Sequence, residues 1–259
     1  MQVIINADDF GFDSDTVRAT IESFEGGVLT SASIMANMPA TEEAIRFARV
    51  HPEFSFGVHL TYARTTNESP IEDISIIETL VGRDGGFMSP NQVRIAALLR
   101  KIDISDIERE TSAQIARLRD CGVPLSHVDS HCHLHKFPVF AEALRRVLPK
   151  FGIRRIRSQQ NLYTHTPFLR PTLWLTYGSN AKLKRNFATT DFMFMPDPSG
   201  DIGWPEGLLR YLMGDGVLEV GIHPGRHDNW REQETANVIH FASLCKSTSC
   251  TMITWKDVQ

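Results

Sequence analysis

Short runs of apolar, often β-branched residues alternate with helical patterns along the 259-residue chain, and this alternation limits the fold more than any other feature. The runs predict strands at residues 3–6, 30–35, 54–60, 127–130, 153–157, 192–195, 217–222 and 251–255. Strands joined by helices usually pair in parallel. We therefore expect an α/β fold, a single (β/α) barrel domain of about seven strands over residues 1–259. A doubly wound open sheet is the competing architecture.

The helical patterns are clearest at residues 41–50, 137–151 and 232–245. A helix is also predicted before Gly26, and two more after residue 90, the second from a capping-box pattern at Ser105 to Gly122. Residues 62–90 are polar and predict a long loop of the kind that is often functional. Residues 162–190 predict one helix and a mobile connection.

Composition excludes several classes of protein. A net charge of −4 leaves no basic surface for nucleic acid or for an anionic membrane. No apolar run approaches the ~18 residues that cross a bilayer. The N-terminal residues do not have the pattern of a signal peptide, so we expect a cytoplasmic location. The four cysteines form no C-x-x-C pair, which predicts reduced thiols.

Polar residues gather where four of the predicted strands end. The segments are NADDFG (residues 6–11), GVHL (57–60), HVDSHCHLH (127–135) and EVGIHPG (219–225). Seven of the ten histidines lie in or next to these segments. Because parallel strands end at one rim of a barrel, we expect these side chains to converge.

Asp9, His59 and His131 come from three of these strand ends and match a catalytic metal site, which takes three protein ligands and keeps one position open. Asp8 and Asp9 would point to opposite faces of a flat strand. At a strand end the backbone curls, and Gly11 would ease that turn, so both can face the pocket. Asp8 would then lie where it can take a proton from water beside the ion.

His223 is a candidate for the second proton transfer, because it would stand across the rim and can act as an acid. Asp129 could orient a metal-bound histidine. Cys132 reads more simply as a small filler residue than as a ligand. The run of alternating histidines favours a metal or catalytic role, yet individual roles stay open for His127, His133, His135 and His227.

The four segments together resemble the YdjC/ChbG-type carbohydrate deacetylases, in order and in spacing, over nearly the whole chain. The resemblance implies a barrel of the polysaccharide-deacetylase type and one divalent metal ion, magnesium or zinc. It implies Asp9, His59 and His131 as metal ligands, Asp8 as general base and His223 as the assisting acid. It also implies that the chain can form a homodimer.

The expected reaction is hydrolysis of the N-acetyl group of an acetylated amino sugar, a chito-oligosaccharide or related glycoconjugate, with release of acetate. One rival is another metal-dependent amidohydrolase or phosphoesterase that pairs His131 with His133. A second rival is a non-catalytic sugar-binding protein with a structural ion. Sugar stacking is a further hypothesis for three tryptophans, against packing in the core, namely Trp174, Trp204 and Trp230.

Overall fold

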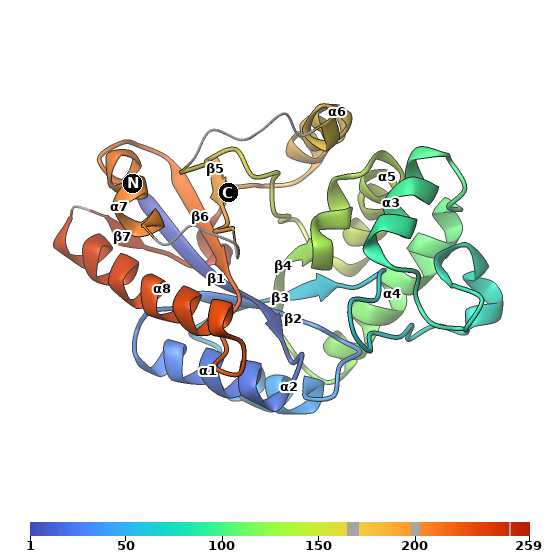
Figure 1. Ribbon diagram of the computed structural model, residues 1–259, viewed down its shortest axis with the longest axis horizontal. Coiled ribbons are helices and arrows are strands. Elements are labelled where there is room, and N and C mark those ends of the chain that lie inside the picture. Colours follow the sequence, from blue (N-terminus) through green and yellow to red (C-terminus); the bar gives the residue numbers. More distant parts are fainter. Residues whose placement is uncertain (165–170, 198–202, 249) are drawn as a thin grey trace.

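A computed structural model describes residues 1–164, 171–197, 203–248 and 250–259. Its strands form a parallel sheet in the order β4-β3-β2-β1-β6-β5, with β7 also paired to β1. The sheet curves into a half-barrel with helices around it (Figure 1). The strands are β1 (Gln2–Phe10), β2 (Ser31–Ile34), β3 (Ser55–Leu60), β4 (Leu125–Ser130), β5 (Phe192–Phe194), β6 (Val217–Ile222) and β7 (Thr251–Met252). The predicted α/β barrel architecture is confirmed.

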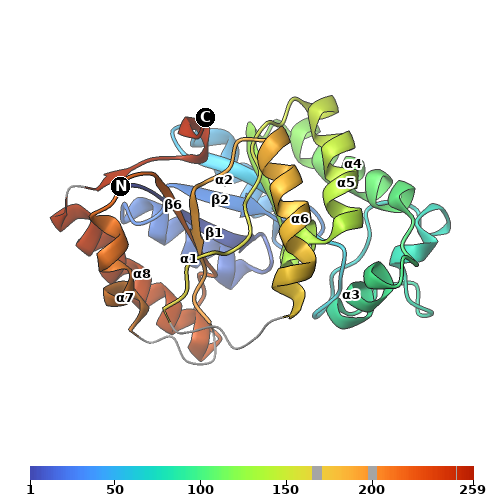
Figure 2. The same ribbon diagram turned by 90° about the horizontal axis from the view of Figure 1, so that it is seen from above.

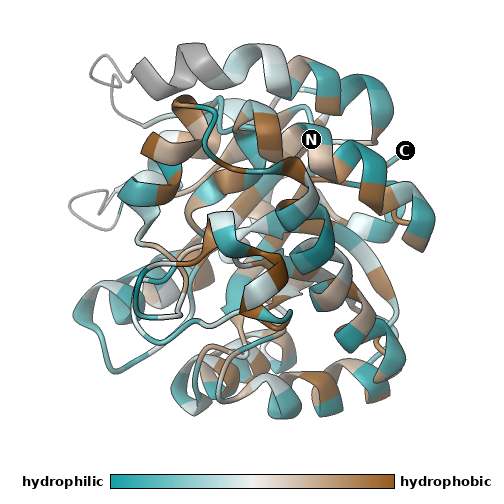
Figure 3. Ribbon diagram, turned by 90° about the vertical axis from the view of Figure 1, so that its right-hand side faces the viewer, coloured by the Kyte–Doolittle hydropathy of each residue, from teal (hydrophilic) through white to brown (hydrophobic). Residues whose placement is uncertain are grey.

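Helices cover the outer surface of the sheet. In Figure 1, α1 and α2 lie below it and α8 crosses in front, whereas α3, α4 and α5 lie at the opposite end from α7. The helices are α1 (Ser14–Glu25), α2 (Thr41–Val50), α3 (Pro90–Leu98), α4 (Ile104–Asp120), α5 (Pro138–Val147), α6 (Pro171–Asn186), α7 (Trp204–Leu212) and α8 (Asn229–Ser247). They carry both hydrophobic and hydrophilic residues, as surface helices must (Figure 3). No helix in the described part of the chain is long and apolar enough to cross a membrane.

The half-barrel leaves a seam between its two edge strands. On the β4 side, Ile156 pairs with Val128, and Arg155 pairs with Ala188. The chain then crosses to the β5 side, where the backbone N–H groups of Asn161 and Leu162 donate to the carbonyl of Met193. Seen from above, α6 runs beside this crossing (Figure 2).

Several local predictions need correction. Residues 153–157 form isolated bridges and no regular strand, because only Ile156 and Arg155 pair with neighbours. Helix α4 begins two residues earlier than the capping-box pattern predicted, since the side chain of Asp103 caps it by accepting from the backbone N–H of Ser105. Helix α7 was not predicted. Its Trp204 is fully buried against Phe194 and Phe241, so this tryptophan packs in the core and does not stack on a sugar.

Two other predicted elements end earlier than the sequence indicated, and each is followed by a 3-10 turn. The last predicted strand continues only as far as Met252 and is followed by a 3-10 turn at Trp255–Asp257. The predicted helix at residues 137–151 is α5 followed by a 3-10 turn at Leu148–Phe151. The helix predicted within 162–190 is α6, whereas the predicted mobile connection falls partly on residues 165–170, outside the described residues. The side chain of Trp174 also lies outside them.

Candidate active site

The end of β1 carries the two adjacent aspartates and is locally irregular. Asp9 has a positive φ of 57°, and the register between β1 and β2 shifts between Ala7 and Phe10. A left-handed residue other than glycine costs about 1–3 kcal/mol and persists only where its surroundings demand it. The turn breaks the strand's alternation, so that both aspartates have an oxygen within reach of His59. The sequence-based expectation of a curled strand end is confirmed.

Asp9, His59 and His131 converge at this point. The Oδ1 atom of Asp9 lies 3.3 Å from Nε2 of His59 and 3.2 Å from Nδ1 of His131. One ligand atom from each of the three residues lies within 4.8 Å of the others. Asp9 and His59 are almost completely buried, whereas the His131 side chain is 14% exposed. An Asp–His–His set that reaches solvent on one side is a donor set typical of a catalytic divalent cation.

Each imidazole also faces a second carboxylate on its far side. Nδ1 of His59 lies 2.8 Å from Oδ1 of Asp129, as the sequence suggested for Asp129. Nε2 of His131 lies 3.4 Å from Oε1 of Glu68, a residue that sequence reasoning missed. Carboxylates behind metal-ligating histidines fix the ring orientation and strengthen the ligand. The only signal for Glu68 was its place in the long polar segment after His59.

The long segment that carries Glu68 is held against α4 by buried carboxylates. Glu110 accepts hydrogen bonds from the backbone N–H groups of Ile71 and Glu72, at 3.1 and 3.0 Å. Asp106 accepts from both the backbone and the hydroxyl of Thr79. Glu68 itself is fully buried. The loop is therefore a fixed wall of the site.

Arg157 organises a second layer of buried charge. Its guanidinium donates to both oxygens of Asp8, at 2.6 and 2.7 Å, and also pairs with Asp129 and Glu219. Asp8, His59 and Asp129 form a second group close enough for a cation. In this group Arg157 pairs with both carboxylates and engages both oxygens of Asp8, whereas the arginine contact of Asp9 is to Oδ2 and leaves Oδ1 facing two histidines, so the Asp9 group is the better cation site. Sequence reasoning missed Arg157 because a fully buried arginine in an extended segment has no local signature.

The pKa of Glu219 illustrates the cost of this burial. Desolvation raises it to about 7, even though Arg157 stabilises the charged form. Trp255 donates from Nε1 to the same carboxylate at 3.3 Å. This carboxylate, from the motif that precedes His223, therefore helps to hold the arginine in place.

His223 follows β6 and is paired with Glu234 of α8. Oε2 of Glu234 accepts from the backbone N–H of His223 at 2.6 Å and lies 3.2 Å from its Nδ1. Burial alone would lower the pKa of His223, but the charge and hydrogen bond of Glu234 raise it. Trp230 lies edge-on to the ring at 5.5 Å. The arrangement favours a protonated imidazole, as an acid requires.

Arg231, also on α8, contacts the candidate ligand Asp9. Its Nη2 donates to Oδ2 of Asp9 at 2.9 Å, which leaves Oδ1 as the oxygen that faces the two histidines. The guanidinium lies over the rings of Trp230 and Phe12. Sequence reasoning missed this residue as well, because α8 is distant in the chain from β1.

The charges of the site match a cation. Burial alone would raise the pKa of Asp9. Hydrogen bonds to His131 and His59 nevertheless hold this pKa well below its usual value. Burial alone would lower the pKa of His59, but Asp129 and Asp9 raise it to about 10. The pKa of His131 is also raised despite burial, mainly by its hydrogen bond to Asp9. The surrounding carboxylates thus draw protons onto both imidazoles. A divalent cation supplies the same positive charge, so these residues fit one.

The other histidines of the motif have different surroundings. His127 stacks on Trp255 with ring centroids 4.8 Å apart, and burial lowers its pKa to about 3. His135 contacts the hydroxyl of Ser130 through Nδ1. Within the described residues, neither His133 nor His135 belongs to a group that could hold a cation. This argues against the rival site that pairs His131 with His133. His227 is exposed.

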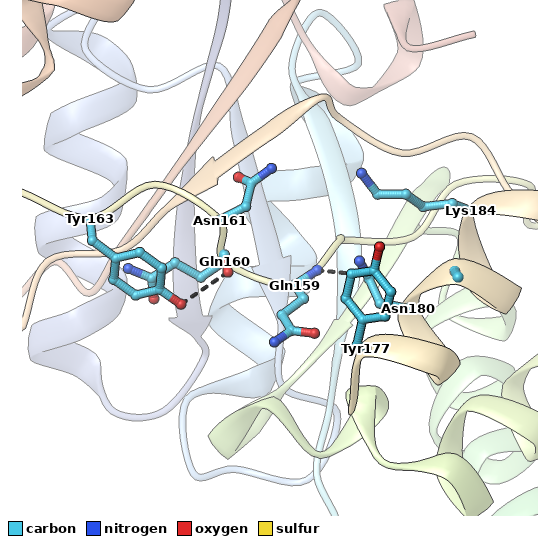
Figure 4. Close-up of a pocket in the computed structure, with 8 residues that line it drawn as sticks. Gln159, Gln160, Asn161, Tyr163, Tyr177, Asn180 and Lys184 are labelled. Atoms are coloured by element: carbon cyan, nitrogen blue, oxygen red, sulfur yellow. Dashed lines mark hydrogen bonds between the residues drawn. The ribbon is translucent and has the colours of Figure 1, made fainter. Parts of the chain in front are cut away.

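A separate cavity of about 630 Å3 lies in the seam of the half-barrel. Figure 4 shows Gln160 and Tyr163 of the crossing segment on one side and Tyr177, Asn180 and Lys184 of α6 on the other. Its volume is within the range of about 300–1,000 Å3 that small-molecule sites occupy.

Comparison with known proteins identifies the family. The model of the YdjC-like protein family matches residues 2–249. The chain belongs to this family. A carbohydrate deacetylase of Geobacillus stearothermophilus is 38% identical over 87% of this chain and 80% of its own length. A carbohydrate deacetylase of Listeria monocytogenes is 32% identical over 68% of each chain.

Solved structures agree on the fold. The fold matches, with a TM-score of 0.79, that of an Enterococcus faecalis protein whose suggested activity is cellobiose-phosphate cleavage. That protein is 21% identical, and the match covers 98% of this chain and 97% of that one. The lactam utilization protein of Thermus thermophilus has a TM-score of 0.53 at 15% identity, covering 97% and 99% of the two chains. At these identities the likeness concerns the fold alone.

Proposed function

We propose that this chain is a metal-dependent carbohydrate N-deacetylase that hydrolyses the acetamide of an acetylated amino sugar and releases acetate. The observation that carries the proposal is the convergence of Asp9, His59 and His131 beside Asp8. His223 is close enough to interact electrostatically with both aspartates. The carbohydrate deacetylases among the relatives support the same chemistry. Asp9, His59 and His131 would hold one divalent ion, magnesium or zinc. When bound, the ion supplies positive charge that makes water more acidic and favours negative charge on the acetyl oxygen.

Asp8 is the proposed general base. Arg157 holds both of its oxygens, and Asn6 donates to Oδ1 at 2.9 Å. A carboxylate has about four acceptor positions, so these three bonds leave one for a water molecule. Arg157 also fixes the direction of that remaining position. In the proposed step Asp8 takes the proton of the water that attacks the acetyl carbon.

His223 is the proposed acid on the other side of the acetamide. Its Nδ1 is engaged by Glu234, so Nε2 is the nitrogen that can give a proton to the departing amine. Proton donation makes the amine a leaving group and completes the products, acetate and a free amino sugar.

The decisive test measures acetate release from a panel of N-acetylated sugars with the metal-loaded protein, the chelated protein and the chelated protein after metal is restored. We expect release that chelation abolishes and metal restores. An Asp9→Ala variant should lose its ion by elemental analysis, since both histidines share this carboxylate. Metal-dependent hydrolysis of a different bond would favour the rival hydrolases, and sugar binding without turnover would favour the binding protein.

A further inference from the structure

The side chain of Arg231 is enclosed near the start of α8, where the fold makes room for it. It is 10% exposed, and its guanidinium lies over the rings of Trp230 and Phe12, at 4.5 and 5.5 Å from the ring centroids. Gly225 forms another wall, since a Cβ atom at this position would lie 2.8 Å from Cδ of the arginine. A side chain at position 225 would therefore displace Arg231, which explains the glycine of the HPG segment.

This enclosed position is costly for an arginine. Nη1 of Arg231 is buried and has no hydrogen-bond partner within the described residues. A buried donor without a partner costs about 1–3 kcal/mol, and burial of the charge adds to this cost. Apart from Asp9, the carboxylate paired with Arg231 is that of Asp228, which lies 3.6 Å from Nε and is 62% exposed. The shorter, buried contact with Asp9 is thus the main polar interaction that holds the guanidinium in this place.

The same contact determines how Asp9 can bind a cation. Nη2 of Arg231 donates to Oδ2 of Asp9 at 2.9 Å. The other oxygen, Oδ1, faces His59 and His131 at 3.3 and 3.2 Å. A carboxylate can bind a metal ion through one oxygen or through both, but binding through both would require Asp9 to give up its bond to the arginine. Asp9 therefore offers one oxygen, and together with two imidazoles the chain supplies three donor atoms.

A set of three donors matters both for the choice of ion and for catalysis. Zn2+ in catalytic sites takes three protein donors and keeps an open position for water. Mn2+, like Ca2+, accepts more donors and favours carboxylate oxygens. A second oxygen from Asp9 would suit such ions and would fill the position that the water needs.

We propose that Arg231 is a positioning residue that restricts Asp9 to one-oxygen binding of the metal ion, which keeps a coordination position open and favours Zn2+ over ions that take more donors. Arg231 acts through Asp9 and contacts neither the ion nor the substrate. The inference rests on the metal site of the proposed deacetylase.

The test measures the Kd values of Zn2+ and Mn2+ by calorimetric titration of the metal-free full chain. Arg231→Met removes the donor and keeps an unbranched side chain between the two rings. Loss of the positive charge strengthens the binding of both ions alike, so this effect cancels in the ratio of the two constants. Loss of an outer partner typically weakens metal binding about 10–100-fold, and Mn2+ recovers part of this loss through the second oxygen. The Zn2+ preference, which is the Kd for Mn2+ divided by the Kd for Zn2+, should therefore fall about three- to tenfold.

A second readout is the visible absorption of the Co2+-loaded protein, which weakens as the number of donors around the ion rises. Arg231→Met should absorb more weakly than the wild type. Gly225→Ala keeps every polar group but displaces the arginine, so it should change both readouts in the same direction. Arg117→Met, which breaks an exposed pair with Glu42, is the matched control and should keep the wild-type values.

A lower Zn2+ preference with weaker Co2+ absorption supports the inference, even if no sugar releases acetate, a result that would overturn only the proposed function. Circular dichroism confirms folding, and if Arg231→Met does not fold, Gly225→Ala decides. Wild-type ratios and wild-type absorption in the folded variants overturn the inference, even if acetate is released. Equal weakening for both ions also overturns it, because Arg231 would then hold Asp9 without choosing how it binds. A wild-type protein that binds neither ion overturns both proposals.

Discussion

The contact between Glu68 and His131 supports a quantitative prediction about metal affinity. Glu68→Gln removes a buried charge 3.4 Å from Nε2 of His131 while it keeps the size of the side chain. Loss of a carboxylate behind a metal-ligating histidine typically weakens metal binding 10–100-fold. A strong charge-assisted hydrogen bond is about 2.7–2.9 Å long, and this contact is longer. We therefore expect a loss in the lower half of the range of about 10–100-fold. The expected loss is about 10–30-fold, or about 1.4–2 kcal/mol.

The assay is calorimetric titration of metal-free protein with Zn2+ and, separately, with Mg2+. Glu68 also accepts hydrogen bonds from the backbone of Thr65 and Thr66, so the substitution can disturb the loop as well. Glu110→Gln, which weakens the anchor of the same loop without contact to His131, measures that contribution. Asp84→Asn, exposed and paired with Arg64, is the neutral control.

Two results would refute the reasoning. If the Kd of Glu68→Gln for each ion stays within twofold of the wild-type value, the carboxylate does not strengthen His131 as a metal ligand. If Glu110→Gln weakens binding as much as Glu68→Gln does, the position of the loop matters and the charge of Glu68 does not. Melting temperatures of the metal-free variants separate this second case from general destabilisation.

Three other predictions concern catalysis and pH. Asp8→Asn should retain its metal by elemental analysis but lose about 10²–10⁴ in kcat, and unchanged turnover would remove Asp8 from the role of base. Because Glu234 raises the pKa of His223, activity should persist to higher pH than a free histidine allows and decline above that raised pKa, and Glu234→Gln should move the decline to lower pH in kcat profiles. In the metal-free protein, the pKa of His59 is raised from 6.5 to about 10, so its stabilising contribution is complete below about pH 6.5 and is lost toward pH 10. The pKa of His127 is lowered from 6.5 to about 3, so its contribution is complete above about pH 6.5 and is lost as pH falls toward 3. Burial lowers the pKa of Lys136 from 10.5 to about 7, which gives that amine the opposite pH dependence over the upper range. The His59 contribution is therefore measured as the difference in free energy of unfolding between the wild type and His59→Gln, which should shrink from pH 6.5 to 10, and a difference that stays constant would contradict the assignment for His59.

Much of the site was predictable because its residues directly follow buried strands. Parallel strands end at one rim, so a polar residue that directly follows an apolar run can be placed at that rim from the sequence alone. This is why Asp9, His59 and His131 could be grouped before any coordinates were considered, and why Asp129 could be placed behind a histidine. Helix α2 was also predictable to the residue, since its apolar positions repeat with the helical period.

The sequence by itself thus determined the strand order along the chain, the alternation that requires a parallel sheet, and which side chains lie at the rim. Tertiary structure alone decided which charges support them. Glu68 comes from a loop and Arg157 from an irregular crossing, and the helical pattern of α8 does not say which partners its Arg231 and Glu234 face. Their roles depend on burial and on partners up to 222 residues away along the chain. The periodicity of apolar residues indicates which face of a helix or strand is buried. Electrostatic pairing depends on the distances between elements, and these distances are set only when the chain packs.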